Sequence, residues 1–296
     1  PMLTAVELVL RQHPSFRSQT SVGSKVSTFV GPSPTLSLHQ ACAMGSLKLL
    51  DLLWEASCTS MDTRSVGWSL SNFLRSEPHY YHWEFIVSLL VAANRGNLEV
   101  VQWLFDHFSG CEAPADAFEE AAVNDHLPVV KFLLANSDNC RDENVVHWSD
   151  YVVTEAATKG HLELVRWLYD NVAHKISQDC TDRVIEQALR FGSIELAEEM
   201  TPPGQNILEY ATEHAAPQVV EMMLDGGFLE TNGRLAAETT SRIADKGHFA
   251  LLERLLTLCS SPTEYMDRWC FAFGNALSKA CELGELPAAS AGASSE

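Results

Sequence analysis

Pairs of small residues recur along the chain, and each pair is followed three positions later by a residue suited to ending a helix. The clearest copies are residues 156–168, A-A-T-K-G-H-L-E-L-V-R-W-L, and residues 92–104, A-A-N-R-G-N-L-E-V-V-Q-W-L. Weaker copies have their turn positions at Gly45, Asp125, Gly192, Ala215, Gly247 and Gly284. A repeat with a step near thirty residues predicts a stacked array, in which each unit packs on its neighbours.

Each copy predicts two short antiparallel helices. In the clearest copy the first helix is expected over roughly residues 150–159, and Gly160 is expected to end it in the left-handed conformation. The second helix then carries Leu162, Val165 and Leu168 on one face. Two helices of about ten residues cannot bury such a face alone, so neighbouring units must cover it.

The repeated pattern resembles the ankyrin repeat, and residues 38–47, L-H-Q-A-C-A-M-G-S-L, match the first half of its motif. The resemblance spans roughly residues 36–286 and implies about seven full or degenerate repeats and a truncated last one. It predicts an all-α fold, an ankyrin-like helical repeat solenoid. The complete T-P-L-H tetrapeptide and the G-A-D-V-N element of that family are absent from every copy. The resemblance therefore implies irregular loops, hairpin fingers that are largely lost, and the loss of the usual hydrogen bonds between units.

Composition shifts and breaks in the repeat predict the domain organisation. We expect an N-terminal helix and irregular lead-in over residues 1–34, the repeat array over 35–287, and a disordered tail over 288–296. An insertion is expected at about residues 57–78, with one added helix within 66–74. The T-P-P-G sequence of residues 201–204 is expected to end the preceding second helix early.

Charge and cysteine usage narrow the class of partner and the compartment. The chain has 39 acidic and 20 basic residues, a formal net charge of −19, which disfavours nucleic acid and anionic membranes as ligands. Its eight cysteines form no C-x-x-C pair, which favours a reducing compartment, the cytoplasm or nucleus. Cys42 and Cys281 occupy the small-residue slot and are expected in the core. The chain begins with Pro1, so removal of an upstream segment, and hence a secreted origin, stays open.

No familiar catalytic motif occurs, and we expect no enzymatic activity and no cofactor. The one cluster suggestive of a metal site is His79 and His82 with Glu84, but it lacks an identifiable third ligand. Pro78 instead indicates a helix start with aromatic side chains packed beneath it. Three further histidines directly follow turn positions and are expected to shape the turns: His126, His161 and His248.

In ankyrin-type arrays ligands bind the concave face. The resemblance implies that this face corresponds here to the two variable residues between each small pair and its turn. We call these residues the tip positions. They are Ala43, Met44, Asn94, Arg95, Val123, Asn124, Thr158, Lys159, Arg190, Phe191, Glu213, His214, Asp245 and Lys246. Aromatic anchors in loops are expected at Tyr80, Trp83 and Trp148. The alternative for any tip position is simple exposure without a role.

These features together predict a monomeric, non-catalytic scaffold or adaptor that binds a partner protein. The basic tip residues suit an acidic or mixed peptide; they are Arg95, Lys159, Arg190 and Lys246. A second hypothesis is a targeting or regulatory array within a larger protein whose catalytic domain lies outside this chain.

Overall fold

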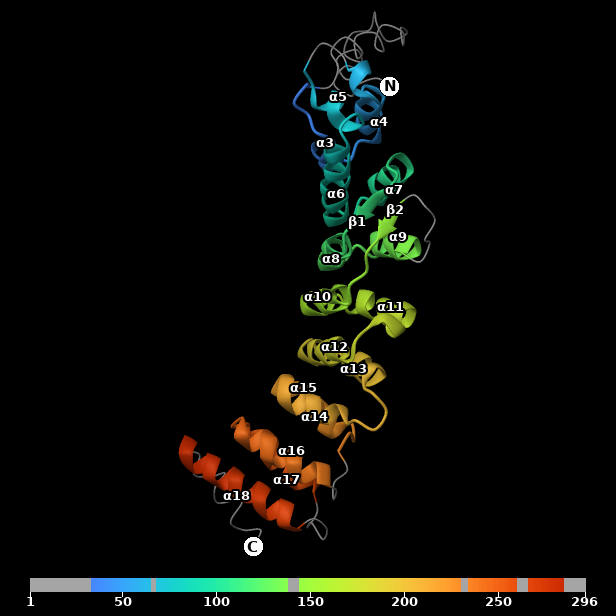
Figure 1. Ribbon diagram of the computed structural model, residues 1–296. Helices are drawn as coiled ribbons and strands as arrows, with labels where there is room; N and C mark the ends of the chain where they lie inside the picture. Colours follow the sequence, from blue (N-terminus) through green and yellow to red (C-terminus); the bar gives the residue numbers. More distant parts are fainter. Residues whose placement is uncertain (1–32, 65–67, 138–143, 230–233, 260–265, 285–296) are drawn as a thin grey trace, which may run out of the picture. The chain divides into compact units, whose positions relative to one another are not determined.

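The computed structural model describes residues 33–64, 68–137, 144–229, 234–259 and 266–284 (Figure 1). The described residues form 16 α-helices, two short 3-10 helices and one pair of three-residue strands, which confirms the all-α prediction. The predicted lead-in lies outside these ranges except for residues 33 and 34, and the predicted tail lies wholly outside them. The chain divides into two compact units, residues 1–156 and 157–296.

The first unit is a two-layer stack of helix hairpins. Its elements are α3 (Leu38–Met44), α4 (Leu47–Glu55), η2 (Met61–Thr63), α5 (Leu70–Leu74), α6 (Pro78–Asn94), α7 (Leu98–His107), β1 (Cys111–Ala113), α8 (Asp116–Val123), α9 (Leu127–Ser137) and β2 (Asn144–Val146). Helices α3, α6 and α8 pack side by side and form the first row. Helices α4, α7 and α9 do the same and form the second row. Each member of the first row pairs with a member of the second in a hairpin, α3 with α4, α6 with α7 and α8 with α9.

The second unit repeats this organisation. Helix α10 (Tyr151–Lys159) spans the junction between the two units, and its last three residues belong to the second. The remaining elements are α11 (Leu162–Val172), η3 (Ala173–Lys175), α12 (Gln178–Arg190), α13 (Ile194–Met200), α14 (Ile207–His214), α15 (Pro217–Asp225), α16 (Arg234–Asp245), α17 (Phe249–Leu258) and α18 (Met266–Leu283). Helices α12, α14, α16 and α18 contact one another in succession, as Figure 1 shows, and α15 contacts α17.

The predicted turn positions adopt the left-handed conformation with one exception. Gly160 has φ 80°, where an L side chain is strained, and Asp125 is the only non-glycine among the described residues with a positive φ, 59°. Glycines at the other turns behave as Gly160 does, and they are Gly45, Gly96, Gly192, Gly247 and Gly284. Ala215 has φ −82° and ψ 161° instead, so the prediction of an equivalent turn there is wrong. Its Cβ disfavours the left-handed region, and Pro217 starts α15 directly afterwards.

The small pairs pack as the sequence predicts. Ala92 and Ala93, like Ala156 and Ala157, have no exposed surface. A side chain of one carbon lets neighbouring helices approach closely, and the packing is tight enough that added volume would be felt. The repeated small residues therefore form the contact between stacked helices within each unit.

The two cysteines of the small-residue slot behave differently. Cys42 is buried, as predicted, whereas Cys281 is exposed, so its assignment to the core is wrong. Ala276 and Ala280 form the buried face of α18, and Cys281, one residue further on, is turned about 100° away from that face.

Breaks in the repeat coincide with the unusual sequence stretches. The stretch predicted as an insertion holds η2 and the five-residue α5, which covers only the second half of the helix expected within 66–74. Helix α13 ends at Met200, immediately before T-P-P-G, as predicted.

The loops after α7 and α9 form a parallel strand pair that the sequence did not predict. Cys111 pairs with Asn144 and Ala113 with Val146. The Asn144 amide donates to the Phe108 carbonyl at 2.8 Å and accepts from the Cys111 backbone N–H at 2.9 Å. Asn144 thus joins the loops of two successive hairpins.

Candidate partner-binding surface

The tip positions are mostly exposed, although the small pairs just before them are buried. In the first unit, Met44, Asn94, Arg95 and Asn124 are exposed, and Ala43 and Val123 are half-buried. In the second unit, His214 is half-buried, and the exposed members are Thr158, Lys159, Arg190, Phe191, Glu213, Asp245 and Lys246. At the end of each first-row helix, the side chains therefore change from buried to partly or fully exposed within two residues. The buried pair packs against neighbouring helices, and the pair after it reaches the surface.

Side chains at several turns also cover the turn of the preceding hairpin. A Cβ added at Gly96 would overlap the imidazole of His126, whose Nε2 lies 3.0 Å from the Asn94 carbonyl oxygen. A Cβ added at Gly160 would lie 2.9 Å from the Phe191 ring. His126 therefore has the structural role at the turn that the sequence predicts. Phe191 contacts the neighbouring turn and still exposes 53% of its surface.

A buried carboxylate joins α3 to α6 in the first unit. Glu84 has no exposed surface and accepts hydrogen bonds from the His39 backbone N–H at 3.0 Å and from the Tyr80 hydroxyl at 2.6 Å. The His39 Nδ1 atom lies 3.2 Å from the same carboxylate. Hydrogen bonds therefore join these two units although the complete T-P-L-H element is absent. Glu84 lies outside the family motif, whereas His39 belongs to the stretch that matches it.

The predicted aromatic anchors lie in different settings. Tyr80 and Trp83 belong to the first turns of α6 rather than to a loop, because Pro78 starts that helix. Tyr80 is half-buried, and its ring centroid lies 5.9 Å from that of Trp83, with the two rings stacked. Trp83 keeps 49% of its surface exposed. Trp148 is half-buried in the loop after β2, and its ring makes an edge contact with Phe118.

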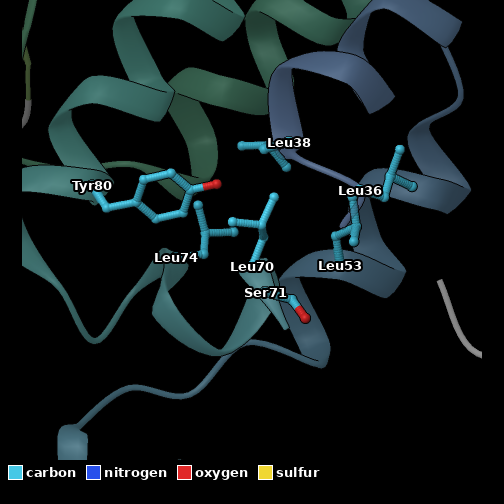
Figure 2. A pocket seen from close by; sticks show the side chains of 7 residues that line it. All are labelled: Leu36, Leu38, Leu53, Leu70, Ser71, Leu74 and Tyr80. Carbon is cyan, nitrogen blue, oxygen red and sulfur yellow. The ribbon is translucent and has the colours of Figure 1, made fainter. Parts of the chain in front are cut away.

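Tyr80 also borders a small hollow between α3, α4 and α5. Figure 2 shows its hydroxyl pointing toward the leucines that line the hollow, whereas the Ser71 hydroxyl points away from them. The lining leucines are Leu36, Leu38, Leu53, Leu70 and Leu74. The hollow has room for no more than about one water molecule, so it is a packing defect rather than a ligand pocket.

Acidic side chains crowd the first row of helices in the first unit. Burial raises the pKa of Glu119, and the neighbouring carboxylates of Asp116, Glu155 and Glu120 raise it further. Glu120 is partly compensated, because the Asn94 amide donates to its carboxylate at 2.7 Å. The tip position Asn94 thus helps to hold α6 against α8.

In the second unit, side chains from successive first-row helices form a ladder. The Tyr210 hydroxyl donates to Asp182 at 3.1 Å, and His214 Nε2 lies 3.3 Å from the Glu186 carboxylate. Arg242 lies 4.0 Å from Glu209, and the Lys246 ammonium donates to the Glu213 carbonyl oxygen. His214 and Lys246 therefore stabilise the stack, whereas Lys159 and Arg190 contact no partner among the described residues.

The described residues show little sign of a metal site or of a reactive cysteine. His79 and His82 are exposed, and no group of three or more potential metal ligands occurs in the described ranges. Burial raises the pKa of the Cys42 thiol to about 12 and that of Cys111 to about 11, which makes both poor nucleophiles. No helix in the part of the chain that the structure describes is long and apolar enough to cross a bilayer.

Comparison with known proteins gives no family assignment. No family model matches the sequence, and no curated protein matches it. The resemblance to ankyrin repeats therefore depends on the motif copies themselves.

Proposed function

We propose that this chain is a non-catalytic scaffold or adaptor of the ankyrin type that binds a partner protein through its tip positions. The observation that carries the proposal is the switch from buried small pair to exposed variable pair at the end of the first-row helices. Packing fixes residue type where a side chain is buried, whereas an exposed position is released from that constraint. The chemistry of the exposed pairs differs from one hairpin to the next, as expected of a surface that recognises a particular partner.

Three exposed tip residues suit a binding role better than the others. Met44 is 64% exposed and Phe191 is 53% exposed, so each offers a large apolar side chain for contact with a partner. Lys159 carries an exposed charge without a partner among the described residues. The tip residues that hold neighbouring helices together, Asn94 and Lys246, have a structural role instead.

Affinity capture from host extract tests this function by comparing two variants with three substitutions each. The tip variant replaces Met44, Lys159 and Phe191 with serine, glutamate and serine. The control variant makes equally exposed changes on second-row helices, namely Gln102→Ser, Met222→Ser and Lys48→Glu. We expect the tip variant to lose partners that the control retains, at similar thermal stability. The same partners bound by both variants would contradict the proposal.

A second candidate function is that of a targeting or regulatory array in a larger protein. The tip surface would then bind another domain of the same polypeptide. Sequencing of the full transcript distinguishes this from the adaptor, because a catalytic domain encoded in frame would favour it.

A further inference from the structure

The second unit carries three basic side chains that its own fold does not use. Lys159 ends α10, and Arg183 and Arg190 lie on α12; all three are exposed and contact no partner among the described residues. Every other lysine and arginine described in this unit has a partner. They are Arg166, Lys175, Arg234, Arg242, Lys246, Arg254, Arg268 and Lys279.

The three cations and one aromatic ring are carried by α12 and the adjoining end of α10. Arg183 and Arg190 are seven residues apart, so they face the same side of α12, about 10 Å from each other along the helix. Phe191 packs against Gly160, the residue after Lys159, which brings the ends of α10 and α12 together. We call Lys159, Arg183, Arg190 and Phe191 the α12 patch.

The acidic residues of α12 are mostly directed elsewhere. Asp182 accepts from Tyr210 on α14, and Glu186 lies beside His214 of the same helix. Asp179 is exposed in the first turn of α12, where the helix dipole favours a carboxylate. Asp179 and Glu186 lie four and three residues from Arg183 on the same helix, but no described carboxylate forms an ion pair with Arg183 or Arg190. Both guanidinium groups can therefore contact a ligand on a chain of net charge −19.

We propose that the α12 patch binds an acidic peptide segment of a partner protein, in a polyproline II conformation, with two carboxylates three residues apart. This deepens the proposed function and rests on it. A polyproline II helix has three residues per turn and rises about 3.1 Å per residue, so carboxylates at i and i+3 lie on one side of the peptide, about 9 Å apart, close to the spacing of Arg183 and Arg190. An apolar side chain beyond them would contact the Phe191 ring, and Lys159 would contact a further carboxylate.

Charge complementarity favours this occupant over a basic or purely apolar one. Arginine offers paired N–H donors that fit a carboxylate in a bidentate manner, and attraction between opposite charges speeds association at low salt. A basic peptide would be repelled from these residues. An apolar peptide would leave three cations without partners.

Fluorescence anisotropy with the full chain and a defined probe tests the proposal. The probe is a labelled twelve-residue peptide with two glutamates three residues apart and a phenylalanine three residues later, in a serine–glycine background. The comparison peptides replace both glutamates with glutamine, or move them to adjacent positions. We expect saturable binding of the probe that weakens with added salt, and weaker binding of both comparison peptides.

Variants of the protein assign the binding to the patch. Arg183→Glu and Arg190→Glu should each weaken binding roughly tenfold, since each turns an attraction into a repulsion. Lys48→Glu changes the net charge equally at an exposed position of the first unit and should leave binding unchanged. Circular dichroism of each variant confirms that it is folded. Phe191→Leu, which keeps an apolar contact with Gly160, should weaken binding less than either charge reversal.

The proposal would be overturned if all three peptides bound equally well or if the probe showed no saturable binding. It would also be overturned if Lys48→Glu weakened binding of the probe as much as the arginine variants do. These outcomes are distinct from failure of the proposed function. If the tip variant loses captured partners but the acidic probe does not bind, the tip surface stands and the acidic partner is wrong. If the tip variant captures the same partners as its control, the proposed function itself is wrong.

Discussion

The turn at Gly96 allows a quantitative test of how successive hairpins of the first unit are fitted together. Gly96 has φ 66°, and a Cβ at this position would overlap the His126 imidazole of the following hairpin. Gly110 has nearly the same φ, 68°, but a Cβ there would meet nothing within 4 Å. The substitutions Gly96→Ala and Gly110→Ala therefore share the backbone strain and differ in the steric overlap.

The two contributions have different expected sizes. Left-handed backbone costs an L residue about 1–2 kcal/mol, so Gly110→Ala should lower the free energy of unfolding by about 1 kcal/mol. Gly96→Ala should add about 1–3 kcal/mol, because His126 must move and surrender its hydrogen bond to the Asn94 carbonyl. The expected loss for Gly96→Ala is therefore about 2–4 kcal/mol.

Urea unfolding followed by circular dichroism measures these losses, and the slope of the transition is compared as well as its midpoint, because repeat arrays can depart from two-state behaviour. A double-mutant cycle isolates the overlap. In a His126→Ala background, Gly96→Ala should cost no more than Gly110→Ala does. Equal losses for the two single glycine variants, or a cycle with no coupling between Gly96 and His126, would refute the packing argument.

Three further predictions concern individual side chains. Tyr80→Phe removes one donor from the buried Glu84 carboxylate and should lower the free energy of unfolding by about 1–3 kcal/mol, measured by urea titration. Glu119→Gln should raise the melting temperature at pH 7, because burial and then nearby carboxylates raise the pKa of Glu119 in the folded state. Its carboxylate thus destabilises the fold above that pKa, and the gain should vanish as the pH falls below the range in which carboxyls ionise; a gain that persists in acid would contradict this assignment. Iodoacetamide should label the exposed Cys281 rapidly and the buried Cys42 only on unfolding, as read by peptide mass spectrometry.

The features that could be predicted from sequence are those for which backbone geometry or close packing restricts the residue type. A left-handed turn favours glycine, so Gly160 could be placed, and closely packed helices demand small side chains, so Ala156 and Ala157 could be placed too. Asp125 followed the same pattern because the acidic side chain tolerates this conformation better than most. Ala215 fits the spacing but cannot form the turn cheaply, and spacing alone misled the prediction there.

The contacts between hairpins could not be predicted, because they join residues whose separation varies. Glu84 reaches His39 across 45 positions, whereas Tyr210 reaches Asp182 across 28. A motif of fixed length does not contain such pairs. Glu84 was notable in the sequence only beside two histidines, and nothing there indicated that it would be buried.

For the tip positions, the sequence predicted exposure. It could not distinguish side chains that contact a neighbouring helix from those that remain available to a partner. Lys246 and Lys159 have the same place in the repeat, yet only Lys246 bonds to the neighbouring helix. The difference depends on whether an acceptor lies within reach, which requires the packed structure. Arg183 lies outside the repeat motif altogether and was found only because other basic residues of the unit are paired.

Site-specific photo-crosslinking tests most directly whether partners bind at the tip positions. A benzophenone amino acid placed at Met44 or at Phe191 samples the proposed surface, and one placed at Met222, which is 61% exposed on the second-row helix α15, is the matched control. After irradiation in host extract, we predict discrete crosslinked species from Met44 and Phe191 and none from Met222. Equal crosslinking from Met222, or none from either tip position, would contradict the assignment of the binding surface.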